Sequence, residues 1–208
     1  TEATIELANE AATEALAHAL GAALRAGDLV ILEGDLGAGK TFFVGALARA
    51  LGVPDDVPVQ SPTFALLHEY PEATPPLVHS DLYRLSDPSE LDELDLEALV
   101  RAGEHVVCVE WGERFTSVLG EPTLLLRLER TGEHTRRAHL RGRESLVRAL
   151  VASRVSVSVS VSVSVSVSVS VSVSVSVSVS VSVSVSVSVS VSVSVSVSVS
   201  VSVSVSVS

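Results

Sequence analysis

The first 154 residues predict an α/β fold with three layers, in which helices cover a mainly parallel sheet and a β-hairpin forms one edge. Residues 29–32 are a continuous apolar run, typical of a strand buried on both faces, and lead directly into a glycine-rich segment and a helical pattern. Strand patterns then alternate with helical patterns, whereas residues 64–83 carry strand signals alone and predict the edge hairpin.

The individual elements follow in order along the chain. A short apolar segment at residues 4–7 precedes Asn9, a suitable cap for an Ala/Leu-rich helix that ends near Gly27. After the first buried strand, residues 42–51 predict a helix that is closed by Gly52. Further strands are predicted at residues 64–70, 77–83, 106–111, 124–128 and 136–140, and further helices at residues 89–102 and 144–154.

The C-terminal segment has a different composition. Residues 155–208 are 27 consecutive Val-Ser pairs. Such alternation is typical of a strand, but natural strands usually end after about 3–10 residues. Every register of the repeat is equivalent, so the segment specifies no unique pairing and favours cross-β association. We therefore divide the chain into a domain at 1–154 and a low-complexity tail at 155–208 without a functional domain; a fibrous or adhesive stalk is the functional alternative.

Charge is distributed unevenly. Residues 1–126 carry 22 acidic and six basic side chains, whereas residues 127–154 carry eight arginines and three glutamates. The acidic excess repels phosphate backbones and disfavours broad nucleic-acid binding by the main body, so a partner is expected to hold any RNA. The arginine-rich end is either a solvated face or a contact for an anion or an acidic partner.

Two further features restrict the class of protein. Cys108 is the single cysteine, which excludes an internal disulfide and a cysteine zinc site. No run of about 18 uncharged apolar residues is present in residues 1–154, and no basic start precedes an apolar stretch. We expect a cytoplasmic protein with no membrane association.

The strongest motif is the pattern G-x-x-x-x-G-K-T, which lies between a predicted strand and a predicted helix and is typical of a phosphate-binding P-loop. Glycines let backbone N–H groups turn around phosphate oxygens, and the helix adds its positive dipole end. Its lysine is the only lysine in the chain, a compact ammonium suited to the phosphate cradle. A glycine-rich turn without a ligand is the structural alternative. The motif consists of Gly34, Asp35, Leu36, Gly37, Ala38, Gly39, Lys40 and Thr41.

Two apolar strands end in a carboxylate, Asp81 in one and Glu110 in the other. A P-loop site needs an acid at the end of a neighbouring strand to hold the magnesium shell, so we expect a metal-binding and water-positioning role here; a solvated strand end is the alternative. Between the P-loop helix and these strands, Pro62 fixes a turn that makes the hydroxyls of Ser61 and Thr63 available to the nucleotide.

These motifs, with the stretch from His79 to Leu85 and with Trp111 directly after Glu110, resemble in order and spacing the TsaE (YjeE-type) P-loop ATPases. These are the ATPase subunits of the bacterial machinery that makes threonylcarbamoyl-adenosine in tRNA. The resemblance covers roughly residues 4–150. It implies a P-loop NTPase-type fold, ATP and Mg²⁺ as ligands, TsaB and TsaD as partner subunits, and tRNA reached only through the complex.

The resemblance also implies roles for individual residues. Expected catalytic residues are Asp81, Lys40 and Thr63, and expected metal ligands are Thr41, Glu110 and Asp81. Thr13 and Arg136 are expected to contact the nucleotide together with all eight residues of the P-loop. Phe42 departs from the family pattern, in which a second Thr or Ser usually follows the P-loop threonine.

Two alternative functions use the same loop. A small-molecule kinase predicts an Arg-rich lid over its acceptor, but the insert between Asp81 and Glu110 is acidic. A non-catalytic, nucleotide-gated binding module would keep Lys40 and Thr41 and have no need of Asp81.

Overall fold

The computed structural model describes residues 1–87, 90–91, 94–153, 159–171 and 175–187. The chain separates into two compact units, Thr1–Val155 and Ser156–Ser208. The helices and strands of the first unit are β1 (Glu2–Leu7), α1 (Glu10–Ala23), β2 (Leu29–Glu33), α2 (Lys40–Ala50), β3 (Leu67–Tyr70), β4 (Leu77–Asp81), α3 (Leu96–Ala102), β5 (Val106–Glu110), η2 (Glu113–Phe115), α4 (Thr116–Leu119), β6 (Leu124–Arg130), β7 (Arg136–Gly142) and α5 (Glu144–Ser153).

The strands of this unit form one sheet in the order β1-β7-β6-β2-β5-β4-β3. The four central strands, β6, β2, β5 and β4, are mutually parallel, as predicted. β3 pairs antiparallel with β4 and forms the predicted edge hairpin. The opposite edge is also antiparallel, because β7 returns beside β6 and β1 then adds to β7. This second antiparallel edge was not predicted.

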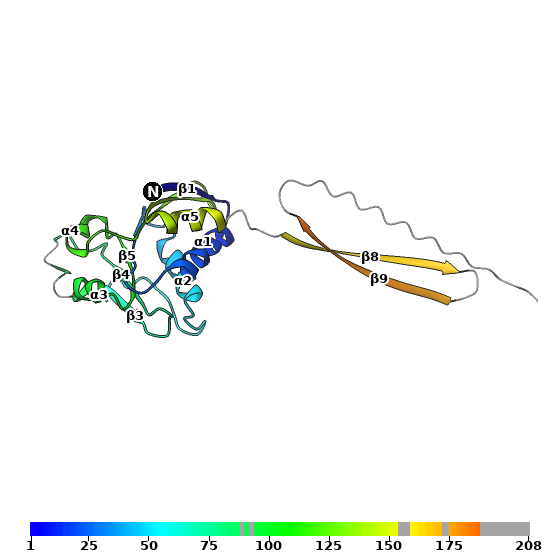
Figure 1. Ribbon diagram of the computed structural model, residues 1–208, viewed down its shortest axis with the longest axis horizontal. Helices are drawn as coiled ribbons and strands as arrows, with labels where there is room; N and C mark the ends of the chain where they lie inside the picture. The colour runs from blue at the N-terminus through cyan, green and yellow to red at the C-terminus, as the bar shows by residue number, and fades with distance from the viewer. Residues whose placement is uncertain (88–89, 92–93, 154–158, 172–174, 188–208) are drawn as a thin grey trace, which may run out of the picture. The chain divides into compact units, whose positions relative to one another are not determined.

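Helices cover both faces of the sheet, which confirms the α/β prediction. Figure 1 shows α1, α2 and α5 on one side and α3 and α4 on the other. The first side buries an apolar cluster that includes Leu20 and Leu47, and the second buries one that includes Ile31, Val109 and Phe115. Cys108 lies within the first cluster, where burial raises the pKa of its thiol and keeps it a neutral core residue.

The sheet register determines where the polar strand ends meet. Asp81 is the register partner of Glu110, and Glu110 is in turn the partner of Leu32 near the end of β2. Because parallel strands end at the same edge of a sheet, the carboxylates of β4 and β5 lie beside the turn that follows β2. The fold therefore brings together three segments that are far apart in the sequence.

Several predicted boundaries were wrong. α1 stops at Ala23 rather than near Gly27, because Leu24 is already extended. The strand predicted at 64–70 begins only at Leu67, since Leu66 has a φ of 65° and donates its N–H to the carbonyl of Pro62 in a turn.

The other boundary errors affect both helices and strands of the sheet domain. Within the helix predicted at 89–102, the α-helix begins only at Leu96, and residues 88–89 and 92–93 lie outside the described residues. The strand predicted at 77–83 ends at Asp81, whose side chain accepts a hydrogen bond from the backbone N–H of Tyr83. α2 begins at Lys40, two residues earlier than predicted, and β6 and β7 each extend two residues further.

The second unit contains an antiparallel ribbon of β8 (Val159–Val171) and β9 (Val175–Val187). In its register valine faces valine and serine faces serine, from Val159 opposite Val187 to Val171 opposite Val175. A shift by two residues would reproduce the same pairing, so the sequence does not favour this register over its neighbours. In the part of the chain that the structure describes, no helix is both long and apolar enough to cross a bilayer.

We expect deletion of residues 155–208 to leave nucleotide binding unchanged and to raise solubility, because every site motif lies upstream and the repeat favours cross-β association. ATP affinity and sedimentation of the full chain and of the shortened chain measure both effects. A loss of ATP affinity on truncation would contradict the proposed division of the chain.

Candidate functional site

Residues 34–41, the P-loop, turn the chain from the end of β2 into the start of α2. Gly34, Gly37 and Gly39 have φ angles of 135°, 79° and 105°, which residues with a Cβ rarely adopt. At Gly34 the constraint is also steric, because an added Cβ would overlap the backbone carbonyl oxygen of Leu128 on β6. The P-loop conformation therefore depends on glycine and on its packing against the neighbouring strand.

Lys40, the first residue of α2, is buried with 5 % of its surface exposed. Its Nζ donates hydrogen bonds to the carbonyl oxygens of Gly34 at 2.7 Å and Asp35 at 3.1 Å. Burial lowers the pKa of Lys40, while the nearby carboxylates of Glu110 and Asp81 act in the opposite direction. The ammonium is thus held in a partly dehydrated position by the loop that precedes it.

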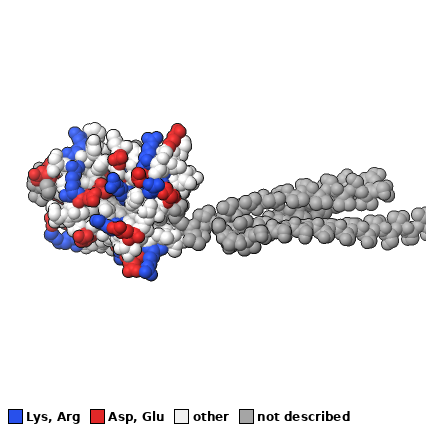
Figure 2. Space-filling model, turned by 90° about the horizontal axis from the view of Figure 1, so that it is seen from above, with Lys and Arg blue, Asp and Glu red and all other residues white. Residues whose placement is uncertain are grey.

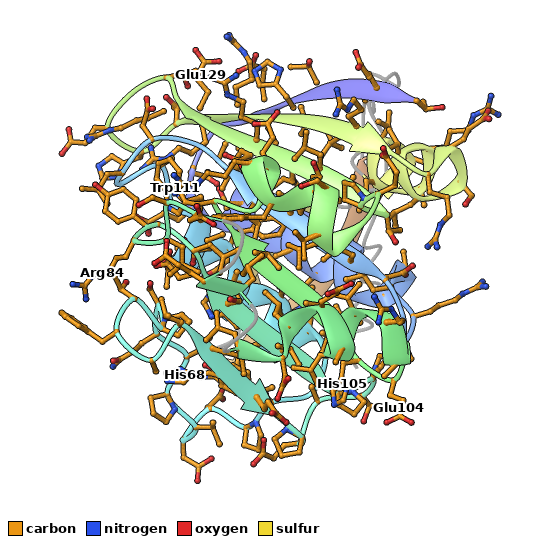
Figure 3. The ribbon with its side chains drawn as sticks, turned by 90° about the vertical axis from the view of Figure 1, so that its left-hand side faces the viewer. His68, Arg84, Glu104, His105, Trp111 and Glu129 are labelled. Carbon is orange, nitrogen blue, oxygen red and sulfur yellow. The ribbon has the colours of Figure 1, made fainter. Side chains whose placement is uncertain are left out.

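Trp111 covers this ammonium, with the Lys40 Nζ 4.1 Å from its ring centroid. The residue has a φ of 62°, a conformation that costs a non-glycine residue about 1–2 kcal/mol. Its backbone N–H donates to the carbonyl of Leu32, and the ring of Tyr83 lies 5.2 Å away, centroid to centroid. Figure 3 shows Trp111 and Arg84 at the same end of the sheet. The strain at Trp111 is tolerated where it places the ring over the lysine.

Glu110 ends β5 and is almost fully buried, with 3 % of its surface exposed. Its Oε1 accepts a hydrogen bond from the hydroxyl of Thr41 at 2.9 Å. The same oxygen lies 3.0 Å from Nε2 of His79, a residue of β4 with none of its surface exposed. Two predicted metal-site residues, Thr41 and Glu110, are therefore in direct contact, and His79, for which no separate role was predicted, joins them.

Asp81 ends β4 and receives hydrogen bonds from the turn that follows α2. Its Oδ2 accepts from the hydroxyls of Ser61 and Thr63, the latter at 2.9 Å, and its Oδ1 accepts from the backbone N–H of Tyr83 at 3.0 Å. The two hydroxyls are 2.7 Å apart. The Ser61–Thr63 turn is thus attached to the strand end that carries Asp81.

These groups surround one cavity of about 390 Å³ at the carboxyl ends of the central strands. In the part of the chain that the structure describes, no arginine side chain lines it. Among the described residues no group of three or more His, Cys, Asp and Glu side chains is placed to hold a metal ion without other ligands. The lining residues are Leu36, Gly37, Gly39, Lys40, Thr41, Phe42, Ser61, Thr63, Asp81, Tyr83, Glu110 and Trp111.

Arg136 lies against the outside of the P-loop and is not in the cavity wall. Its Nε donates to the carbonyl of Ala38 at 2.8 Å, and its Nη1 donates to the carbonyls of Gly132, Glu133 and Thr135. The guanidinium therefore connects the β6–β7 turn to the P-loop. The predicted contact of Arg136 with the nucleotide stays a prediction.

Thr13 is also outside the cavity wall. It is buried within α1, and its hydroxyl donates to the backbone carbonyl of Asn9 at 3.3 Å. Phe42, which replaces the second hydroxyl residue of the family pattern, lines the cavity with 41 % of its surface exposed. The first turn of α2 thus presents a ring where the family pattern has a hydroxyl.

A protein-family model and a solved structure both match this chain. The family model for the threonylcarbamoyl adenosine biosynthesis protein TsaE matches residues 7–138, which include the P-loop and both strand-end carboxylates. The chain is also similar to a solved structure, the crystal structure of Bacillus subtilis YdiB, with a TM-score of 0.58 and 30 % identity over 73 % of this chain and 95 % of that one.

Individual proteins are similar over the same region. A protein of Streptomyces coelicolor named tRNA threonylcarbamoyladenosine biosynthesis protein TsaE is 46 % identical over 118 residues, which are 55 % of this chain and 77 % of that protein. The protein of the same name from Nostoc sp. is 45 % identical over 53 % of this chain and 68 % of its own length. The one from Bacillus subtilis is 38 % identical over 62 % of this chain and 78 % of its own length.

The two glycines Gly34 and Gly37 provide a matched test of the P-loop geometry. We expect Gly34→Ala to abolish nucleotide binding and to lower stability, because the Cβ overlaps the carbonyl of Leu128. Gly37→Ala meets no atom within 4 Å and should cost only the conformational strain of about 1–2 kcal/mol. Thermal unfolding and ATP titration of both variants test this. Equal losses in the two would contradict the steric argument.

Proposed function

The chain belongs to the TsaE family of threonylcarbamoyl adenosine biosynthesis proteins, and from that premise we propose that it is a magnesium-dependent ATPase that supports the formation of threonylcarbamoyladenosine in tRNA. The observation that carries the proposal is the convergence of Lys40, Thr41, Glu110 and Asp81 on one cavity behind a P-loop. Together they provide one ammonium, one hydroxyl and two carboxylates, the groups that an Mg²⁺–nucleotide complex requires.

Binding of ATP would use the P-loop and Lys40. The Lys40 Nζ now donates to two backbone carbonyls of its own loop. Phosphate oxygens are stronger acceptors for an ammonium than neutral carbonyls, so the lysine is expected to exchange these partners for the β- and γ-phosphates. The N-terminus of α2 starts at this lysine and contributes its unpaired N–H groups and positive dipole end.

Magnesium would be held by the Thr41 hydroxyl and the Glu110 carboxylate, together with nucleotide phosphates. The two side chains already contact one another at 2.9 Å. Both provide the oxygen ligands that Mg²⁺ prefers. A bound metal supplies neutralisation of phosphate charge, and the protein's share is to hold these two groups at the edge of the cavity.

Asp81 and Thr63 would act in hydrolysis. Asp81 lines the cavity, and its carboxylate is oriented by the Ser61–Thr63 turn and by the Tyr83 N–H. A carboxylate fixed in this way can orient a water molecule and accept its proton. A module that only bound nucleotide would not need this arrangement, which favours the catalytic proposal.

We expect turnover by the isolated chain to be slow. Among the described residues no arginine lines the cavity, and Nε and Nη1 of Arg136 donate to four backbone carbonyls. In P-loop enzymes an arginine supplied to the transition state is worth about a thousandfold or more. We therefore assign the stimulation of ATP hydrolysis to the partner subunits TsaB and TsaD.

We propose that the partner subunits, and not this chain, hold the tRNA. We place the protein in the cytoplasm, where ATP and tRNA are present. Figure 2 shows acidic and basic side chains interspersed over the face in view. The excess of acidic residues in the first 126 repels an RNA backbone. We therefore propose that ATP turnover changes the state of the partner complex and that the chemistry on tRNA occurs in another subunit.

We expect Asp81→Ala to reduce partner-stimulated phosphate release by about a hundredfold or more while ATP affinity stays near that of the wild type, since a water-orienting group matters mainly after binding. Asp56→Asn, at an exposed loop position, is the matched control and should behave as wild type. Phosphate release is measured with and without TsaB and TsaD, and with small-molecule kinase acceptors. Normal stimulated turnover by Asp81→Ala, or phosphate transfer to an acceptor, would contradict the proposal.

A further inference from the structure

His79 is a buried, polar residue that the proposed function does not yet use. It lies on β4, two residues before Asp81, and none of its surface is exposed. Side chains alternate along a strand, so His79 is on the same face of the sheet as Asp81. It does not line the cavity. Its one hydrogen bond among the described residues joins Nε2 to the Oε1 of Glu110 at 3.0 Å.

The roles of the two Glu110 oxygens differ. Oε1 receives both the Thr41 hydroxyl and His79. Oε2 accepts no hydrogen bond from the described part of the chain, although Glu110 lines the cavity. An ionised carboxylate only accepts hydrogen bonds, so Nε2 of His79 is the donor. The histidine thus fixes one oxygen and leaves the other available.

Packing alone does not explain a histidine at this position. Its Nδ1 is buried and has no hydrogen-bond partner in the described residues. Burying a polar atom without a partner costs free energy, which an apolar side chain of similar size would avoid. The contribution of the residue must therefore come from Nε2, and Nε2 contacts Glu110.

We propose that His79 is the positioning residue for the Glu110 carboxylate, which it holds with Oε2 directed to the magnesium position. This inference rests on the proposed function, because it assigns Mg²⁺–ATP to the cavity. Thr41 is expected to turn its hydroxyl from Glu110 to the metal when Mg²⁺–ATP binds. His79 is then the remaining donor to Oε1, so its hydrogen bond matters most in the metal-bound state.

The test uses the full chain and a non-hydrolysable ATP analogue, whose binding is titrated at increasing Mg²⁺ and in EDTA. His79→Leu removes the donor, whereas His79→Gln keeps an amide N–H near the position of Nε2. Cys108→Ala is the matched control, because Cys108 is the register partner of His79 and is equally buried but donates nothing to Glu110. If His79→Leu does not fold, His79→Asn replaces it, since its shorter amide does not reach Glu110.

We expect His79→Leu to raise the Mg²⁺ concentration for half-maximal analogue binding by about 10–100-fold, the usual effect of losing a residue that orients a metal ligand. Analogue binding in EDTA should be the same for His79→Leu as for the wild type. In His79→Gln the Mg²⁺ concentration for half-maximal binding should return most of the way to the wild-type value. In Cys108→Ala it should equal the wild-type value. An unshifted titration for His79→Leu, an equal shift for Cys108→Ala, or no recovery in His79→Gln would overturn the inference. Magnesium-independent binding by the wild type would instead overturn the proposed function, and with it this inference.

Discussion

The arrangement of the site depends on one buried ammonium group. Lys40 lies at the point where the P-loop and the ends of β4 and β5 meet, with Trp111 above it and two carboxylates nearby. A charge in this position needs compensation, because desolvation of an ammonium is costly. The carbonyls of the P-loop, the ring of Trp111 and the nearby carboxylates together offset the desolvation cost of the ammonium. The strained backbone of Trp111 places its ring over the ammonium, and Gly34 lets the P-loop pack against β6. Both are needed for this arrangement around Lys40.

The two carboxylates are fixed in different ways, which suits different roles. Glu110 is held by Thr41 of α2 and by His79 of the adjacent strand, both close to the sheet. Asp81 is held instead by hydroxyls of a turn that joins α2 to β3. Under the proposed function, a change in the bound nucleotide would be expected to act on Glu110 through α2 and on Asp81 through the turn. Such a connection is what a subunit needs if its nucleotide state is to alter the state of a partner.

The sequence predicted those parts of the site that depend on short-range patterns. The P-loop and the strand-end carboxylates follow from glycine spacing and from apolar runs. The contact of His79 with Glu110 requires the register of β4 and β5, which no local pattern specifies. Arg136 was placed near the nucleotide by resemblance, whereas its guanidinium donates hydrogen bonds to backbone carbonyls of the P-loop and of the β6–β7 turn. Helix and strand ends were missed where Leu24 and Leu66 adopt extended or left-handed backbone conformations.

The proposed ATP site requires Lys40 to exchange the carbonyls of Gly34 and Asp35 for nucleotide phosphate. Because Lys40 is the only lysine in the chain, lysine-selective isotope labelling gives one side-chain signal in an NMR spectrum. We expect this signal to shift in a saturable manner as Mg²⁺–ATP is added and to be absent from a Lys40→Ala spectrum. A lysine signal that stays unchanged while ATP binding is detected by another method would contradict this exchange of partners by Lys40.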